Sequence, residues 1–147
     1  MIRFIKVEEL LSIRNDVLRG GILTLDECRF PSDDVGGAFH IGYFTNDLGN
    51  KLLSIASFHP QTYGDFAGTG YQLRGMATIE GQRGKGLGNQ LLNYGMVYLR
   101  GQGASYIWCN ARKKAVSFYQ HMGFEVISPE FEVPVIGPHY VMYAKLG

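Results

Sequence analysis

The sequence has no excess of charge of either sign and very few cysteines, and both shortages exclude classes of protein. Its 14 Lys and Arg against 13 Asp and Glu leave a formal net charge of +1, which gives no support to a nucleic-acid partner, because such partners usually require a basic face. The two cysteines, Cys28 and Cys109, lie far apart and make no disulfide framework. Because the histidines and cysteines also lack metal-ligand spacing, we expect no metal and reduced thiols, as in the cytoplasm.

Long apolar segments are also missing. No run of 18 apolar residues indicates a membrane-spanning helix, and residues 1–11, MIRFIKVEELL, carry acidic side chains and lack the apolar core of a signal peptide. We therefore expect no membrane contact and a cytoplasmic location. A chain of 147 residues with 46% hydrophobic and 18% charged residues is typical of one globular domain spanning residues 1–147.

Glycine, by contrast, is abundant, at 20 of 147 residues, and its most informative cluster is RGKGLG at residues 83–88. A strand pattern at residues 71–79 precedes this cluster, and a helical pattern follows it. Glycines let a backbone approach a ligand closely, and the first turn of a helix offers unpaired N–H groups and a positive dipole end. The stretch therefore predicts an anion site, to which Arg83 and Lys85 add positive charge.

The remaining patterns predict a mixed α+β fold. Helical apolar spacing occurs at residues 7–18, 22–29, 87–99 and 110–122, where Asn110, Ala111 and Arg112 are expected to open the last helix. Strand patterns occur at residues 1–7, 38–45, 51–59, 71–79, 104–109, 124–127 and 139–146. Short turns between the early strands predict an antiparallel meander. Strand, helix and strand from residue 71 to 109 predict a βαβ unit whose two strands lie parallel.

Two motifs resemble those of the GNAT superfamily of acetyl-CoA-dependent N-acetyltransferases, in particular its small bacterial members. The first is R-x-x-G-x-G, with Arg83, Gly86 and Gly88 in the fixed places; neither G-x-x-x-x-G-K-[ST] nor G-x-G-x-x-G is met. The second is ARKKAVSFYQHMGF, residues 111–124, which is similar to the family's A-x-x-F-Y helix that ends in G-F. The matching residues there are Ala115, Phe118, Tyr119, Gly123 and Phe124.

The resemblance implies an acyl-CoA N-acyltransferase fold: a mostly antiparallel central sheet with one parallel βαβ unit and helices on both faces. It also implies acetyl-CoA as co-substrate, with the pyrophosphate on the glycine loop and the pantetheine arm beside the strand that ends at residue 78. Many family members have asparagine where Arg112 stands, so the choice between Asn110 and Arg112 stays open. The implied cofactor-binding residues are Met76, Ala77, Thr78, Arg83, Gly84, Lys85, Gly86, Leu87, Gly88, Asn89, Asn110 and Arg112.

The resemblance further implies that Tyr119 lies near the thioester sulfur and is the general acid for the departing thiolate. A tyrosine hydroxyl with a pKa of about 10 can donate that proton at neutral pH. Direct attack by a neutral amine needs no covalent intermediate, and a backbone N–H at Thr78 or its neighbour is a candidate donor to the oxyanion. The group that deprotonates the amine stays open among His40, Glu80, Glu132 and His139.

The acceptor also stays open between a small-molecule amine and a peptide amine. The segments expected to shape its pocket, residues 20–34, 60–70 and 129–139, hold neither a dense cluster of acids nor a patch of bases. Two other functions remain as alternatives: a non-catalytic acyl-CoA-binding module on the same fold, with Tyr119 in the core, and a different phosphate-ligand-binding protein with a fortuitous loop match. Because the superfamily often forms dimers, a homodimer is a further expectation.

Overall fold

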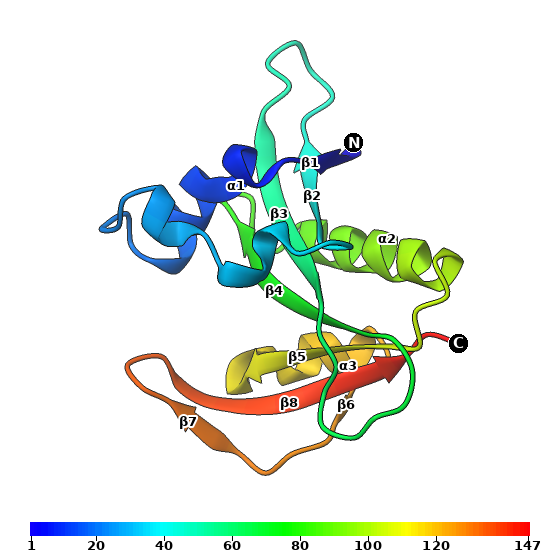
Figure 1. The fold of residues 1–147 in the computed structure, drawn as a ribbon. Coiled ribbons are helices and arrows are strands. Elements are labelled where there is room, and N and C mark those ends of the chain that lie inside the picture. Colours follow the sequence, from blue (N-terminus) through cyan, green and yellow to red (C-terminus); the bar gives the residue numbers. More distant parts are fainter.

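A computed structural model describes all residues from Met1 to Gly147 and has one eight-stranded sheet at its centre (Figure 1). The strand order is β1-β2-β3-β4-β5-β8-β6, and β7 pairs with β8 off this path. The strands are β1 (Ile2–Ile5), β2 (Phe39–Phe44), β3 (Leu52–Pro60), β4 (Gly70–Thr78), β5 (Tyr106–Arg112), β6 (Glu125–Val126), β7 (Phe131–Val133) and β8 (Gly137–Lys145). The helices are α1 (Val7–Ile13), α2 (Leu87–Gly101) and α3 (Val116–His121).

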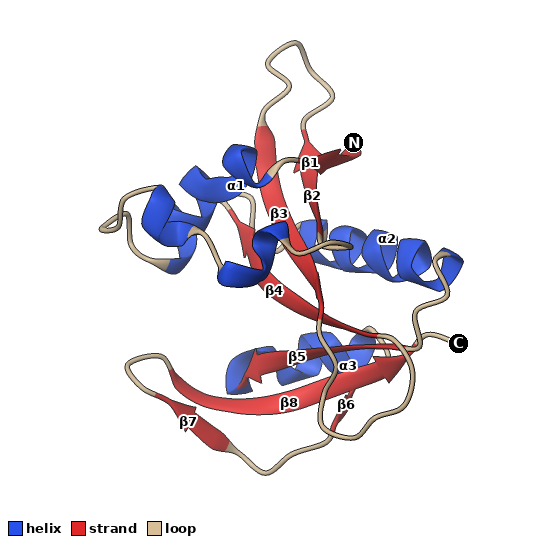
Figure 2. Cartoon of the chain, in the orientation of Figure 1, coloured by secondary structure: helices blue, strands red, loops and turns tan.

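The expected antiparallel meander and parallel βαβ unit are both confirmed. Strands β1 to β4 pair antiparallel in sequence, and β4 pairs parallel with β5 across the α2 crossover. The parallel pairing covers Gly70–Gln72 against Tyr106–Trp108 and then stops, so that β4 and β5 diverge (Figure 2). This divergence leaves the edge of β4 from residue 73 to residue 78 without a neighbouring strand.

Helices cover both faces of the sheet, as expected. On one face, α2 and α3 bury leucines and aromatics against β3, β4 and β5 in the main core. On the other face, α1 packs Leu10 and Leu11 against Ile55 of β3 and Ala77 of β4. A π-helical turn, Arg14–Leu18, continues α1, so the helix predicted over residues 7–18 is present with a widened last turn.

The loop at residues 61–69 covers the outer face of β5. The Trp108 indole donates to the carbonyl of Gln61 at 2.8 Å, and the amide of Tyr63 donates to the Tyr106 hydroxyl at 2.8 Å. The Tyr63 ring also packs against Trp108, with the centroids 5.0 Å apart. None of residues 61–69 lines the cleft that is described below.

Two predicted helix positions are wrong. Residues 22–29 form only a 3-10 turn, Asp26–Cys28, and a second such turn follows at Pro31–Asp34. Asn110 to Arg112 do not open a helix, because they extend β5 and pair with Val141, Tyr140 and His139 of β8. Sheet pairing at this point outweighs the local helical spacing, and α3 begins only at residue 116, after a 3-10 turn at Lys113–Ala115.

Candidate active site

A cleft of about 690 Å³ opens where β4 and β5 diverge. The backbone of β4 is available along this opening. The amide of Ile79 donates to the carbonyl of Leu53 in β3 at 2.9 Å. Because successive residues of a strand direct their backbone groups to opposite edges, the N–H and C=O groups of Thr78 face the opening. The carbonyl of Thr78 there accepts a hydrogen bond from Nε of Arg83 at 3.3 Å. The predicted site residues that line the cleft are Met76, Ala77, Thr78, Arg83, Gly88, Asn110, Arg112 and Tyr119.

The glycine loop presents an uninterrupted run of free backbone donors. No backbone N–H from Arg83 through Asn89 donates a hydrogen bond within the chain, and the first bond of α2 runs from Gln90 to Gly86 at 3.1 Å. Gly84 and Gly86 have φ angles of +76° and +80°, which side-chain-bearing residues rarely adopt. Gly84, Lys85, Gly86, Leu87 and Asn89 belong to this loop and helix start but do not line the cleft. The loop thus has the donor arrangement of an anion site.

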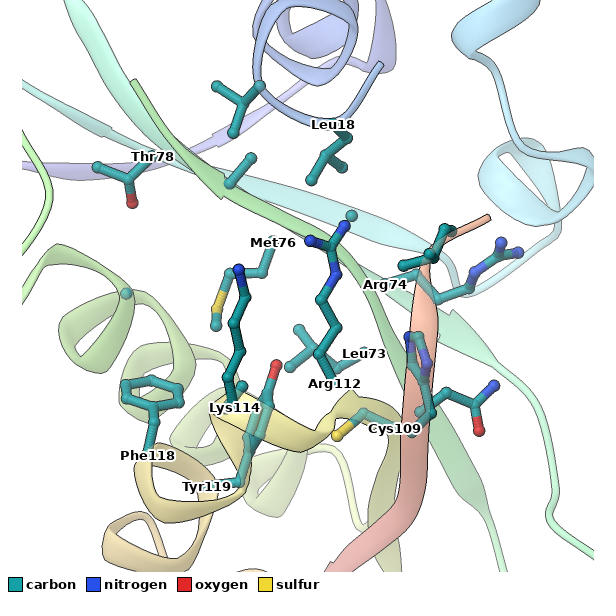
Figure 3. A pocket seen from close by; sticks show the side chains of 18 of the residues that line it. Leu18, Leu73, Arg74, Met76, Thr78, Cys109, Arg112, Lys114, Phe118 and Tyr119 are labelled. Carbon is teal, nitrogen blue, oxygen red and sulfur yellow. The ribbon is translucent and has the colours of Figure 1, made fainter. Parts of the chain in front are cut away.

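Tyr119 lies at the inner wall of the cleft, on α3. The side chain is 9% exposed, and its ring packs against Phe118 and Phe124, with centroids 5.1 Å and 5.4 Å away. Its hydroxyl is directed into the cleft, between the strand that ends at Arg112 and the lysine at position 114 (Figure 3). Burial, together with the nearby Cys109, raises the pKa of Tyr119 far above its usual value, so the hydroxyl stays protonated.

Cys109, on β5, lies beside Tyr119 of α3 and also lines the cleft. The residue is 2% exposed, and burial raises the pKa of its thiol to about 12. A neutral thiol is a poor nucleophile. The arrangement therefore favours packing rather than covalent chemistry for Cys109.

Of the residues considered for deprotonating an amine, the structure brings only His139 into the cleft. Its Nδ1 lies 2.8 Å from the carbonyl oxygen of Gly137 and donates to it, so Nε2 is the ring nitrogen that carries the lone pair in the neutral tautomer. His40 is instead buried between the Ser57 hydroxyl and the carbonyl of Asp33. Glu80 and Glu132 are exposed and do not line the cleft.

The cleft is lined by positive side chains and by no carboxylate. Arg19 comes from the turn after α1, Arg74 from β4, and Arg112 from the end of β5. Arg83 and Lys114 complete the cationic lining. The sequence did not reveal this cluster, because its five members come from four separate segments that only the fold brings together.

Behind the cleft lies a buried polar cluster centred on Asp33. Arg14, 1% exposed, donates to the Asp33 carboxylate at 2.7 Å and to the Ser57 hydroxyl at 2.9 Å. His59 Nε2 lies 2.9 Å from the other carboxylate oxygen, while its buried Nδ1 has no partner. Because a carboxylate oxygen only accepts, His59 donates to Asp33 through Nε2.

Opposing effects act on the ionisation of this cluster. Burial works to raise the pKa of Asp33, but hydrogen bonds from His59 and Arg14 outweigh it and hold the pKa far below its usual value. Burial lowers the pKa of His40, so His40 is neutral at physiological pH. At the centre of the cluster lies the ion pair of Arg14 with Asp33, with the neutral His40 and the Ser57 hydroxyl beside it.

A divergent parallel pair, a donor-rich helix start and a buried tyrosine hydroxyl are the features that the resemblance to the GNAT superfamily leads us to expect. Comparison with known proteins agrees: residues 16–124 match the model of the acetyltransferase (GNAT) family. The chain is also 36% identical, over 99% of its length and 95% of the relative's, to the uncharacterized N-acetyltransferase YitI of Bacillus subtilis (strain 168). The chain therefore belongs to the GNAT family and is an N-acetyltransferase.

Solved structures share the fold at low sequence identity. A GNAT-family acetyltransferase from Streptococcus pneumoniae aligns with a TM-score of 0.74 and 16% identity, over 100% of this chain and 99% of that one. An aminoglycoside 6'-N-acetyltransferase complexed with coenzyme A aligns with a TM-score of 0.69 and 14% identity, over 100% of this chain and 97% of that one. At this identity the likeness supports the fold alone.

Two further observations concern groups outside the cleft. No three His, Cys, Asp or Glu side chains gather where they could hold a metal ion. None of the helices combines the length and the apolar character that crossing a membrane requires.

Proposed function

We propose that the protein transfers an acetyl group from acetyl-CoA to a primary amine by direct attack, with Tyr119 as the general acid. The observation that carries this proposal is the run of free backbone donors from Arg83 to Asn89, which leads along the open edge of β4 to the Tyr119 hydroxyl. Pyrophosphate, an amide-bearing arm and a thioester occur in this order in acetyl-CoA, and the donors, the open edge and the hydroxyl match them in the same order.

The residues present fit this co-substrate. The free N–H groups of the loop suit the pyrophosphate, since the positive end of the α2 dipole and the Arg83 and Lys85 charges add to them. The backbone of Met76 and Thr78 suits the amides of the arm, because it lies along the edge that lacks a strand. Asn110 and Arg112 border the same cleft from β5, and both stay candidates for further contacts with the co-substrate.

Bound acetyl-CoA supplies the activated acetyl group, and the chain supplies position and proton transfer. Backbone N–H groups at the bulge of β4, where residues 75 and 76 face Ala56, are suited to stabilise negative charge on the acyl oxygen. Tyr119, protonated and shielded from water, is suited to give its proton to the leaving thiolate. His139, with a free Nε2 lone pair, is the candidate to take a proton from the incoming ammonium.

A thermal unfolding series tests the co-substrate assignment. Acetyl-CoA, CoA, ATP and NAD are each added at the same millimolar concentration. A ligand that binds only the folded state at about 100 times its dissociation constant adds about 2.7 kcal/mol, so acetyl-CoA and CoA should raise the midpoint by several degrees. Stabilisation by ATP or NAD instead would favour a nucleotide-binding protein and contradict the proposal.

Turnover then separates an enzyme from a binding module. A library of primary amines is incubated with acetyl-CoA, and the free thiol of CoA is detected. Thiol release that depends on a particular amine supports the transferase. Stabilisation by acetyl-CoA with no amine-dependent release across the library would support the non-catalytic acyl-CoA-binding module.

A further inference from the structure

The charge of the cleft constrains its second substrate. Arg19, Arg74, Arg112 and Lys114 line it beyond the loop arginine, and no Asp or Glu does. Coenzyme A brings phosphates, but the glycine loop that suits them lies at the C-terminal end of β4. Arg83 of this loop donates a hydrogen bond to the carbonyl of Thr78 there. A cation at the opposite end of the cleft is not explained by those phosphates.

Arg74 is such a cation. It lies four residues before Thr78 on β4, or about 13 Å along the strand, and Figure 3 shows Tyr119 and Arg112 between the two. The residue is half-buried, and its guanidinium takes part in none of the ion pairs of the chain. Burial and the neighbouring Arg14 lower its pKa, and the negative charge of Asp33 opposes this change only in part.

The guanidinium of Arg74 is nevertheless held in position. Its Cζ lies 4.1 Å from the centroid of the Phe30 ring, and Cζ of Arg14 lies 3.9 Å from the same centroid. The amide of Phe30 donates to the Asp33 carboxylate at 2.7 Å, so the buried cluster fixes the ring. A Cβ at Gly75 would lie 3.1 Å from this ring, so a larger residue there would disturb it.

The surroundings of Arg74 combine this charge with apolar surface. Phe30, Val17 and Leu18 line the cleft from the segments that follow α1, and Val133 and Ile136 line it from β7 and the turn after it. A guanidinium beside apolar side chains suits an anionic group on an otherwise apolar molecule. A polyamine would meet only like charge here.

We propose that the acetyl acceptor is an amine that also carries a carboxylate, such as an amino acid, and that Arg74 binds this carboxylate. The inference rests on the proposed transferase function, which it deepens by naming the substrate class. Arg74 is a specificity-determining residue in this assignment, and Phe30 is the residue that positions it.

The first experiment compares amines that differ only in the anionic group. Phenylalanine is compared with phenylalaninamide and phenethylamine, and glucosamine 6-phosphate with glucosamine, all with thiol-release detection. The carboxylate should raise kcat/KM by about tenfold to a hundredfold, as for a charge-assisted hydrogen bond. A comparable gain from phosphate alone, with none from carboxylate, would overturn the carboxylate assignment.

The second experiment locates the effect on Arg74. In R74Q the advantage of the acid over its amide should fall to about twofold or less, because kcat/KM for the acid falls much more than kcat/KM for the neutral amine. R74K, which keeps the charge without the planar fork, should recover part of the advantage. R100Q, which removes an exposed arginine on α2, is the matched control and should keep the full preference.

The outcomes separate this inference from the function on which it rests. Equal rates for phenylalanine, phenylalaninamide and phenethylamine, or an unchanged preference in R74Q, would overturn the inference and leave an N-acetyltransferase standing. Stabilisation by CoA with no amine acetylated would overturn the proposed function, and the inference with it. F30L adds a further test, since loss of the ring contact should weaken the acid preference more than it affects the KM for acetyl-CoA.

Discussion

Gly95 of α2 lies directly on the ring of Phe58 of β3, so closely that a Cβ at position 95 would overlap the ring. Phe58 is completely buried and stacks on Phe39, with the ring centroids 4.7 Å apart, so it has no room to move away. This contact sets the distance between α2 and the sheet. It thereby fixes the start of α2, and the donors of the glycine loop, relative to β4.

Replacing Gly95 by alanine should destabilise the protein by about 2 kcal/mol or more, because overpacking forces helix and sheet apart. Helix propensity alone predicts the opposite, a gain of about 1 kcal/mol. G101A, in the last turn of the same helix, meets nothing within 4 Å and is the matched control. Urea unfolding of both variants measures the difference, and equal or greater stability of G95A would contradict the packing argument.

Replacing Tyr119 by phenylalanine should lower kcat by about a hundredfold or more, since a positioned general acid contributes on that order. The KM for acetyl-CoA should change little, because the ring and its packing remain. Y94F removes a tyrosine hydroxyl from the outer face of α2 and should behave like the parent. A Y119F protein that keeps the parental kcat with its best amine would exclude Tyr119 as the acid.

The pH dependence of the rate should follow the acceptor and not Tyr119. Since burial raises the pKa of Tyr119 above its usual value, its hydroxyl stays protonated while the amine loses its proton. The value of kcat at saturating amine should therefore rise with pH as the bound amine loses its proton, with no alkaline fall below about pH 10. Rates measured from pH 6 to 10 with amines of different pKa check this, and a fall near pH 8 shared by all the amines would contradict it.

Replacing Gly86 by valine should raise the KM for acetyl-CoA at least tenfold and leave the KM for the amine nearly unchanged. The side chain would occupy the approach to the free N–H groups, and the φ of +80° adds about 1–2 kcal/mol of strain. Gly103, at the other end of α2, has the same φ of +80°, so G103V carries similar strain without touching the loop. Unchanged cofactor affinity in folded G86V would remove the loop from the site.

Replacing Asp33 by asparagine should cost about 3–5 kcal/mol at pH 7, because it leaves the Arg14 charge buried without a partner. The folded pKa of Asp33 lies below its unfolded value of 3.8, so its stabilising contribution is present above pH 3.8 and is lost as the pH falls further. The difference between parent and D33N should therefore shrink below about pH 4.

D34N, which changes the exposed neighbour in the same 3-10 turn, is the control for D33N and should alter stability by less than about 0.5 kcal/mol. Urea unfolding at pH 7, 5, 4 and 3 gives both comparisons. A constant difference between parent and D33N across this range would mean that the carboxylate charge is not what stabilises the cluster.

The sequence by itself determined the features that depend on local chemistry. Alternating apolar residues specified the meander strands, and glycines at positions that require left-handed φ specified the loop between β4 and α2. The order of strand, loop, helix and strand then specified the parallel pair, because such crossovers have one hand. The family motifs, which are short and contiguous, predicted roles for Tyr119 and the loop residues from the sequence alone.

Only the tertiary structure decided what depends on residues far apart in the chain. Pairing with β8 turned Asn110–Arg112 from a predicted helix start into strand. Divergence of β4 and β5 opened the cleft, and the fold selected His139 over three other candidates for a place in it. The ion pair of Arg14 with Asp33 and the contact of Phe30 with Arg74 join separate segments of the chain. No pattern in the sequence predicts either contact. Packing, and not local propensity, brings these charges together.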